Sequence, residues 1–179
     1  VIGAISPWNF PVNLALAPLA GIIAAGNRVM HKPSELTPVT SDVLKTMIEE
    51  YFDEGEMAVF VGGPEVGAAF SGLPFDHLMY TGSTAIAKHV MKAASENLVP
   101  LTLELGGKSP VVVGKSAKIQ DVAQRVMQGK TMNAGQICLA PDYALVPEEK
   151  VDDWRKQLKE SEKEGNFGFT SFPVLTSAY

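Results

Sequence analysis

The sequence predicts an α/β fold in which a parallel sheet carries helices on both faces. Short apolar runs that are typical of strands alternate with longer helix-like runs along most of the 179 residues. This alternation is the pattern of β–α units, whose parallel strands are buried between helices. The composition, with 46% hydrophobic and 20% charged residues, is that of a globular protein. The length suits one domain, or one domain with part of another.

The first half of the chain contains both kinds of run. An apolar run at residues 1–5 predicts a buried strand, and a Pro- and Asn-rich loop follows it. The next run, an apolar helix over 14–25, is expected to end at Gly26-Asn27, because Gly is favoured just after a helix C-terminus. The other elements expected here are strands over 28–32 and 58–61, a helix over 40–51 capped by Thr40-Ser41-Asp42, and a short helix over 66–70.

The second half continues the alternation and then loses it. Strands are expected over 77–81, 101–105, 110–113 and 143–146, and helices over 84–95 and 121–132. Beyond Pro147 the pattern weakens, because residues 148–164 form a highly charged helix candidate and residues 165–179 show no clear period.

The composition argues against several classes of function. A net charge of -5 with scattered Lys and Arg residues provides no basic surface for nucleic acid. No apolar run reaches the roughly 20 residues that a membrane span needs, and no signal peptide is visible. The single cysteine excludes an internal disulfide framework and a cysteine-based zinc site, and a free thiol fits the reducing cytoplasm.

Cys138 is a candidate nucleophile. A lone cysteine is most often a small buried hydrophobic residue. Residues 133–136 (Asn-Ala-Gly-Gln), however, form a small and polar stretch before Cys138, unlike a core strand. A nucleophilic thiol needs such an exposed loop with backbone N–H groups close by. We therefore expect covalent thiol chemistry at this residue.

Two further side chains are candidates to assist such a nucleophile. Glutamate usually faces solvent, but Glu104 ends an apolar strand and precedes Gly106-Gly107. The carboxyl end of a parallel strand is where α/β enzymes place chemistry, so Glu104 is a candidate general base. Asn9 lies in a loop bounded by prolines, where it either forms an Asx turn or directs an amide N–H at a developing oxyanion.

Two turns are candidates to bind a nucleotide. Residues 82–84 (Gly-Ser-Thr) join a strand to a helix start, where N–H groups can bind phosphate, although many helices begin in this way. Residues 32–35 (Lys-Pro-Ser-Glu) are either a charged surface turn or a strand end whose acidic residue holds ribose hydroxyls. A G-x-G-x-x-G pattern does not follow the first strand, so these turns alone do not support an ordinary dinucleotide site.

Together these motifs resemble the aldehyde dehydrogenase superfamily in their order and spacing, and the separation between Glu104 and Cys138 is the family spacing. The run at residues 138–143 (Cys-Leu-Ala-Pro-Asp-Tyr) looks most like the class 3 and coniferyl-aldehyde dehydrogenase branch. The matching motifs, which lie between residue 1 and about residue 147, are Pro7-Trp8-Asn9-Phe10-Pro11, Lys32-Pro33-Ser34-Glu35, Tyr80-Thr81-Gly82-Ser83-Thr84, Leu103-Glu104-Leu105-Gly106-Gly107-Lys108 and Asn133-Ala134-Gly135-Gln136-Ile137-Cys138.

The resemblance implies a Rossmann-like cofactor-binding domain and oxidation of an aldehyde to a carboxylic acid with NAD, or with NADP, which this branch often accepts. Cys138 would attack the aldehyde to form a thiohemiacetal and then a thioester. Asn9 and the backbone N–H of Cys138 would stabilise the oxyanion, and Glu104 would activate the water that releases the acid. The residues implied in cofactor binding are Trp8, Lys32, Ser34, Glu35, Gly82, Ser83, Leu105 and Gly106.

Within that cofactor site, the resemblance gives separate roles to the two turns. Lys32 and Glu35 would hold the adenosine ribose, and Ser83 would face the pyrophosphate. Glu35 would repel a 2′-phosphate, which favours NAD over NADP. No metal ion is implied.

The resemblance also implies how the chain is organised. Residues 1–132 would be an NAD(P)-binding domain that is incomplete at its N-terminal side, and residues 133–179 the start of a truncated catalytic domain. The chain begins on a strand without Met and contains no Glu-x-Phe-Gly-Pro motif, so we expect an internal fragment. The whole protein would act in the cytoplasm on a small-molecule aldehyde as a homo-oligomer, without binding nucleic acid or a membrane.

Two residues depart from the family pattern. Ala87 stands where the family usually has glycine, and His31 stands where an apolar residue is common. We expect the added methyl group of Ala87 to matter little for packing. We expect His31 to be buried with its hydrogen bonds satisfied.

Two alternative functions stay open. A relative in the same superfamily passes its thioester to CoA or phosphate, but Glu104 argues against this, since hydrolysis needs that base. The other alternative is a non-catalytic nucleotide-binding or structural module, against which the intact set of Cys138, Glu104 and Asn9 argues. Whether the product is free acid or acyl-CoA distinguishes aldehyde oxidation from the first alternative. Thiol labelling that NAD does not alter would favour the second.

Overall fold

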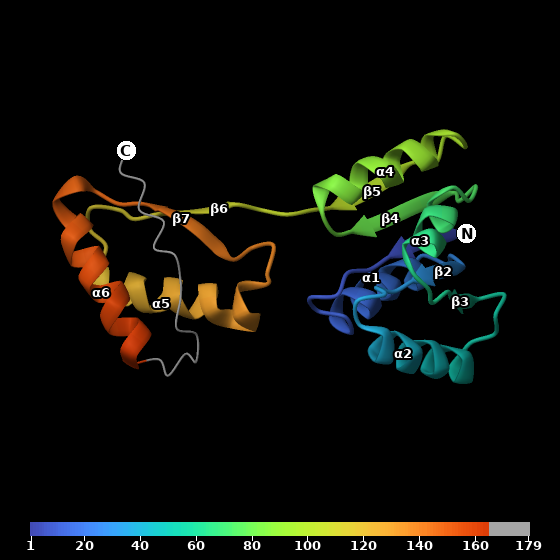
Figure 1. Ribbon diagram of the computed structural model, residues 1–179, viewed down its shortest axis with the longest axis horizontal. Helices are drawn as coiled ribbons and strands as arrows, with labels where there is room; N and C mark the ends of the chain where they lie inside the picture. Colours follow the sequence, from blue (N-terminus) through green and yellow to red (C-terminus); the bar gives the residue numbers. More distant parts are fainter. Residues whose placement is uncertain (165–179) are drawn as a thin grey trace. The chain divides into compact units, whose positions relative to one another are not determined.

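The computed structural model describes residues 1–164, and the chain divides into two units after Gly106 (Figure 1). Each unit has its own sheet. The division predicted after residue 132 separates functional regions and stays a prediction. The expectation for residues 165–179 lies outside the described residues. Among the described helices, none combines the length and the apolar character needed to span a membrane.

The first unit contains a five-stranded parallel sheet with the order β3-β2-β1-β4-β5. In this order the chain winds outwards from β1 in both directions, as in doubly wound nucleotide-binding sheets. The predicted fold class is therefore confirmed. The elements are β1 (Ile2–Ile5), α1 (Asn13–Ala24), β2 (Val29–Lys32), α2 (Pro38–Tyr51), β3 (Met57–Val59), α3 (Pro64–Ser71), β4 (His77–Thr81), α4 (Thr84–Ser95) and β5 (Leu101–Glu104).

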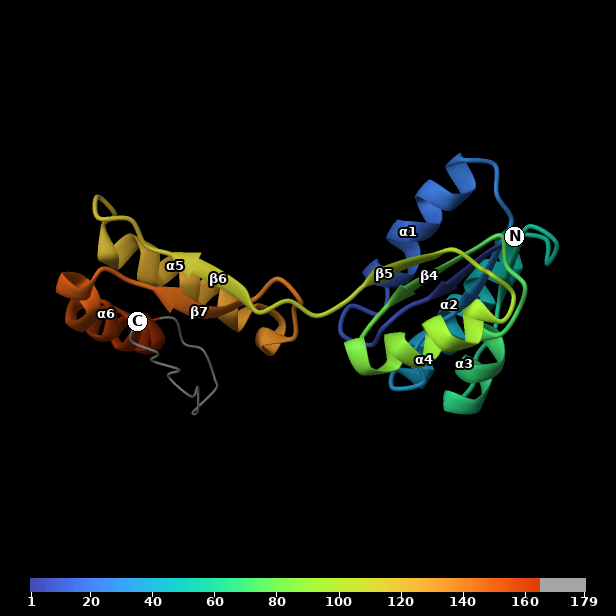
Figure 2. The ribbon, with the colours of Figure 1, turned by 90° about the horizontal axis from the view of Figure 1, so that it is seen from above.

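Helices cover both faces of this sheet. Successive residues of a strand point to opposite faces, so Val29 packs with Leu19 of α1 and Ile48 of α2, while Met30 packs against a second cluster. That second cluster joins β4 to α3 and α4, and includes Phe70. Figure 2 shows α1 and α4 on opposite sides of β4 and β5.

The second unit is a short parallel sheet of β6 and β7 packed with two helices. Its core joins Val113 after β6 to Ile119 and Ala123 of α5 and to Trp154 of α6. The elements are β6 (Ser109–Val112), α5 (Ile119–Thr131), the 3₁₀ helix η1 (Met132–Gly135), β7 (Pro141–Leu145), the 3₁₀ helix η2 (Glu148–Lys150) and α6 (Val151–Glu164).

The predicted end of α1 is confirmed, but the predicted start of α2 is wrong. Gly26 follows α1 with φ of +77°, a conformation that glycine adopts easily. Residues 40–42 do not cap α2, because Pro38, whose ring fixes a helical φ, already begins the helix. Ser41 is instead buried, and its hydroxyl donates to the carbonyl oxygen of Ser34 at 2.8 Å.

Other boundaries shift by a few residues. β3 ends at Val59, two residues earlier than predicted, and Gly62 has φ of +152° where the chain turns toward α3. The charged helix predicted over residues 148–164 is divided into η2 and α6. β5 ends at Glu104, so Leu105, predicted as the last residue of that strand, lies in the segment that follows it.

Candidate functional site

The carboxyl edge of the five-stranded sheet collects most of the predicted site residues. Because the strands are parallel, the segments that follow them all emerge at this edge. The strand order reverses between β1 and β4, and open α/β sheets bind ligands in the crevice outside such a reversal. The predicted residues at this edge are Trp8, Asn9, Lys32, Ser34, Glu35, Gly82, Ser83, Glu104, Leu105 and Gly106.

The loop that carries Asn9 is held at both ends. Ser6, directly after β1, is 5% exposed, and its Oγ lies 2.8 Å from Nε2 of His31 in β2. At the other end, the N–H of Leu14 in α1 donates to the carbonyl oxygen of Phe10 at 2.9 Å. Asn9 is half-buried between these two attachments.

Trp8, the neighbour of Asn9 that is implied in cofactor binding, is 43% exposed. An indole of this kind offers a broad apolar surface at the mouth of a site. Its exposure leaves it available to wall a bound cofactor.

Lys32 and Glu35 form an ion pair at the end of β2. Nζ of Lys32 lies 2.7 Å from Oε2 of Glu35, and the two side chains are 3% and 38% exposed. The hydrogen bond from Lys32 holds the pKa of Glu35 below its usual value of 4.5, so the carboxylate is ionised at neutral pH. The pair therefore presents an accessible carboxylate whose orientation a buried cation fixes.

A pocket of about 280 Å³ lies beside this ion pair. Ser34 and Glu35 line one side, and Gly62 and Gly63, which follow β3, line another. The glycine pair was not among the predicted site residues, although two glycines at a strand end are a signal of close backbone approach to a ligand. The complete lining is Pro33, Ser34, Glu35, Pro38, Ser41, Asp42, Val61, Gly62 and Gly63.

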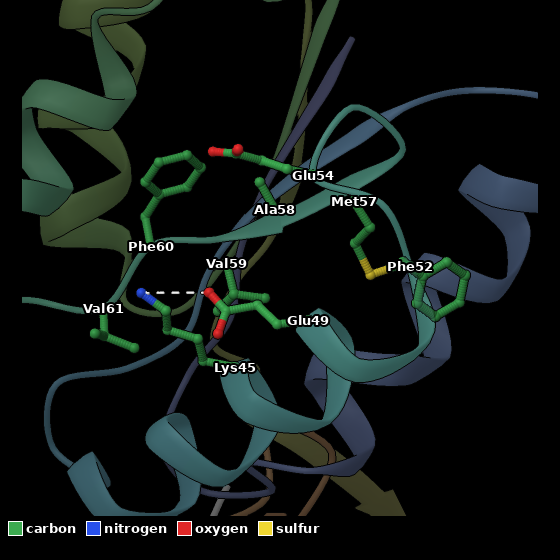
Figure 3. A pocket seen from close by; sticks show the side chains of 9 residues that line it. All are labelled: Lys45, Glu49, Phe52, Glu54, Met57, Ala58, Val59, Phe60 and Val61. Carbon is green, nitrogen blue, oxygen red and sulfur yellow. Dashed lines mark ion pairs between the residues drawn. The ribbon is translucent and has the colours of Figure 1, made fainter.

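A larger pocket of about 400 Å³ lies along β3 and α2 and contains none of the predicted site residues (Figure 3). The ion pair between Lys45 and Glu49, with 3.6 Å between its atoms, crosses this pocket. This pocket lies along the edge strand β3, whereas the smaller pocket lies at the carboxyl ends of β2 and β3 and is lined by the predicted residues Ser34 and Glu35. We therefore regard the smaller pocket as the candidate ligand site. The larger one is lined by Lys45, Glu49, Phe52, Glu54, Met57, Ala58, Val59, Phe60 and Val61.

The turn after β4 leads into the N-terminus of α4. Oγ of Ser83 caps this helix by accepting the N–H of Ile86 at 3.3 Å. Tyr80 is buried and donates its hydroxyl to the carbonyl oxygen of Ser83 at 3.3 Å, and burial raises the pKa of Tyr80. A Cβ at Gly82 would overlap the Tyr80 hydroxyl. The helix N-terminus, with its positive dipole end and the first-turn N–H groups that Ser83 does not cap, suits a phosphate.

Glu104 is the last residue of β5, and it is exposed. Its backbone carbonyl accepts the N–H of Gly82 at 2.9 Å, which fixes the end of β5 to the turn that starts α4. Leu105 packs against the apolar cluster under α3 and α4, and Gly106 is exposed. The carboxylate of Glu104 is therefore open to water.

Cys138 belongs to the second unit, where it lies in the turn between η1 and β7 with its side chain exposed. The exposed loop expected around Cys138 is confirmed. Before it, Asn133, Ala134 and Gly135 have φ of +48°, +56° and +77°. Residues other than glycine rarely adopt this left-handed conformation, and such strain gathers at functional sites.

Two contacts inside the second unit support the turn that carries Cys138. Gly107 faces the Cys138 carbonyl oxygen so closely that a Cβ on Gly107 would overlap it. Lys108, with φ of +87°, places Nζ 3.1 Å from Oδ1 of Asp142. Sequence reasoning did not predict either contact, because both depend on the pairing of β6 with β7.

The model of the aldehyde dehydrogenase family matches residues 1–172. The chain belongs to the aldehyde dehydrogenase family. A relative described as a probable coniferyl aldehyde dehydrogenase of Caulobacter vibrioides is 68% identical over 159 residues, which are 89% of this chain and 33% of that protein. The predicted resemblance to the coniferyl branch is therefore confirmed.

Solved structures of aldehyde dehydrogenases share the fold. Staphylococcus aureus AldH in a substrate-bound state superposes with a TM-score of 0.86 at 47% identity, over 91% of this chain and 36% of that one. Aldehyde dehydrogenase C of Pseudomonas syringae, complexed with NAD+ and octanal, superposes with a TM-score of 0.85 at 30% identity, over 90% and 34%. The chain thus spans about a third of the length of the family members it matches.

Proposed function

We propose that the protein containing this chain oxidises an aldehyde to a carboxylic acid with NAD+, using Cys138 as the nucleophile. The observation that carries the proposal is the exposed Cys138 thiol, which follows three left-handed residues, 133–135, after an interval of two residues. Strained backbone that presents a thiol to solvent has no evident structural use, whereas it suits a nucleophile.

In the proposed reaction the Cys138 thiolate adds to the carbonyl carbon of the aldehyde and forms a thiohemiacetal. The charge that develops on the carbonyl oxygen needs hydrogen-bond donors, and the amide of Asn9 and the backbone N–H of Cys138 take that role. The two attachments of the Asn9 loop, at Ser6 and at Phe10, restrict the directions in which this amide can point.

When bound, NAD+ would supply the acceptor for the hydride on the thiohemiacetal carbon, and loss of that hydride leaves an acyl thioester on the Cys138 sulfur. Glu104 then takes a proton from a water molecule, and the oxygen of that water attacks the thioester, which releases the acid and restores the Cys138 thiolate, while the proton on Glu104 passes to solvent. The exposure of Glu104 supports this role, because the base must reach water.

The residues at the sheet edge fit a dinucleotide. Glu35 accepts hydrogen bonds from the adenosine ribose, while the ion pair with Lys32 holds the Glu35 carboxylate in place. The pocket of about 280 Å³ beside them is of a size for the adenine. Ser83 and the N-terminus of α4 receive the pyrophosphate. The charge of Glu35 favours NAD+ over NADP+, which carries a 2′-phosphate.

The test uses the longest natural protein that contains this chain, with coniferyl aldehyde and octanal as substrates. The first follows from the relative's name and the second from the ligand of aldehyde dehydrogenase C. We expect NADH formation with equimolar free acid, and a loss of at least about 10³-fold in Cys138→Ala. Ser116→Ala changes an exposed residue of the same unit and is the control. NAD+ reduction that survives Cys138→Ala would rule out this nucleophile.

A further inference from the structure

His31 is a fully buried histidine in the first unit, on β2 between Ala4 of β1 and Val59 of β3. Its Nε2 lies 2.8 Å from Oγ of Ser6, which is also buried. Its Nδ1 has no hydrogen-bond partner among the described residues. The predicted burial of His31 is therefore confirmed, but the prediction that its hydrogen bonds are satisfied is wrong for one ring nitrogen.

The Nδ1 of His31, unpaired within residues 1–164, lowers the stability of the fold, so the presence of a histidine at this position needs an explanation. A buried polar atom without a partner destabilises the fold, and an apolar side chain of similar size would avoid that penalty. The imidazole offers what an apolar side chain cannot, the hydrogen bond to Ser6. The function of His31 is therefore to be sought in what that bond holds.

The bond holds the start of the Asn9 loop. The backbone N–H of Ser6 also donates to the carbonyl oxygen of Lys32 at 3.2 Å, so both the side chain and the backbone of Ser6 are attached to β2. Ser6 lies three residues before Asn9 in the sequence. On the other strand, Lys32 follows His31 and pairs with Glu35. His31 thus links the loop of the proposed oxyanion donor to the strand end of the proposed ribose site.

The surroundings keep the imidazole neutral. Burial, and then the positive charge of Lys32, lower the pKa of His31 from 6.5 to about 4. No charged residue lies on α1 or β3, and the buried residues of α2 are uncharged. The neutral ring can either accept a hydrogen bond from the Ser6 hydroxyl or donate one to it.

We propose that His31 is a positioning residue, whose hydrogen bond to Ser6 fixes the loop that carries Asn9. This role rests on the proposed function, in which Asn9 stabilises the oxyanion. His31 itself touches neither substrate nor cofactor. Because small displacements of a catalytic group are costly, loss of this bond lowers the rate of aldehyde oxidation more than it lowers NAD+ affinity.

Three variants test this role in the longest natural protein that contains the chain: His31→Leu, Ser6→Ala and His31→Gln. We expect the first two to lower kcat/KM for the aldehyde roughly tenfold, and to raise the Kd for NAD+ by a clearly smaller factor, since Trp8 lies in the same loop. Combining His31→Leu with Ser6→Ala should lower kcat/KM no further, because the two substitutions remove the same hydrogen bond. His31→Gln keeps an amide that can pair with Ser6 and should restore most of the activity. If His31→Leu does not fold, Ser6→Ala, which removes only a hydroxyl, still decides.

His77 is the matched control. Its Nε2 lies 2.8 Å from Oγ1 of Thr102, so it is also a histidine–hydroxyl pair, but it lies at the amino end of β4. We expect His77→Leu to leave kcat/KM unchanged. An active enzyme whose kcat/KM is indifferent to Ser6→Ala, or falls in step with NAD+ affinity, would overturn the positioning role. A wild-type protein that oxidises no aldehyde would instead overturn the proposed function, and the role of His31 with it.

Discussion

Gly107 faces the backbone carbonyl oxygen of Cys138 with no room for a side chain between them. The contact lies within the second unit and joins the glycine turn of one family motif to the cysteine turn of another. A glycine pair after a strand is often explained by backbone conformation alone. Here the second glycine is required for a steric reason: only a residue without a side chain lets the turn that carries the proposed nucleophile pack against it.

Gly107→Ala is expected to displace the Cys138 turn, because the new Cβ overlaps a backbone oxygen that cannot rotate away. We expect kcat/KM for the aldehyde to fall roughly 10- to 100-fold. Alkylation of Cys138, followed by intact-mass spectrometry, should slow in parallel. Gly114→Ala is the control in the same unit, since no atom lies within 4 Å of its added Cβ. Equal kinetics for wild type and Gly107→Ala would show that the turn tolerates the shift.

Glu35→Gln is expected to weaken the preference for NAD+ over NADP+. The substitution removes the negative charge that would repel a 2′-phosphate, while an amide can still pair with the ribose. We expect the ratio of the two Kd values, measured by fluorescence titration, to shift about tenfold toward NADP+. Glu49→Gln removes the carboxylate of the ion pair in the larger pocket and should leave the ratio unchanged. An unchanged ratio in Glu35→Gln would place the ribose elsewhere.

The lowered pKa of His31 should appear in how the free energy of unfolding depends on pH. Its pKa is about 4 in the fold and 6.5 in an ordinary environment, so between these values the unfolded chain binds more protons than the folded one. The neutral ring therefore contributes stability fully above pH 6.5, and this contribution is lost as the pH falls toward 4. By pH 5 the loss is about 2 kcal/mol.

Urea unfolding of wild type and His31→Gln between pH 5 and pH 7.5 measures this effect. The variant lacks the titrating ring, so its free energy of unfolding should fall less on acidification. Carboxylates that titrate in the same range contribute equally to both proteins and cancel in the comparison. Parallel pH profiles would contradict the lowered pKa of His31.

Tyr80→Phe is expected to weaken NAD+ binding modestly. The lost hydroxyl donates to the carbonyl oxygen of Ser83 and so braces the turn at the start of α4. One neutral hydrogen bond is worth about 1 kcal/mol, which corresponds to a rise of about fivefold in the Kd for NAD+. Tyr51→Phe, at a tyrosine that is 72% exposed, should have no effect. A Kd that does not change in Tyr80→Phe would mean that the turn holds its shape without the hydroxyl.

The fold was predictable because its signals are local. Alternating strand-like and helix-like runs indicate the order of the elements, and Gly and Pro residues between the runs mark their ends. Gly26, with its positive φ just after α1, is an example. The cap predicted at residues 40–42 was wrong because α2 already begins at Pro38, and Ser41 inside the helix donates instead to the carbonyl oxygen of Ser34. A side chain that can cap a helix can equally bind a neighbouring segment, and spacing alone does not separate the two cases.

Parts of the candidate site were not predictable because they depend on strand order. Gly62 and Gly63 reach the pocket of Glu35 only because β3 lies next to β2. The bond between Ser6 and His31 likewise requires β1 beside β2 in the observed register. Spacing along the chain identifies candidate groups such as Cys138 and Glu104, whereas neighbouring strands supply the residues that hold such groups in place.

The most direct test of the proposed mechanism is to trap the acyl-enzyme. Glu104→Gln lacks the proposed base for hydrolysis, so aldehyde and NAD+ should leave a thioester on Cys138 that accumulates. Intact-mass spectrometry with peptide mapping should show the added acyl mass on the Cys138 peptide, only when NAD+ is present. Glu96→Gln, at an exposed glutamate, should turn over without accumulation. Acyl mass on another residue, or its absence in a Glu104→Gln protein that still reduces NAD+, would contradict the account.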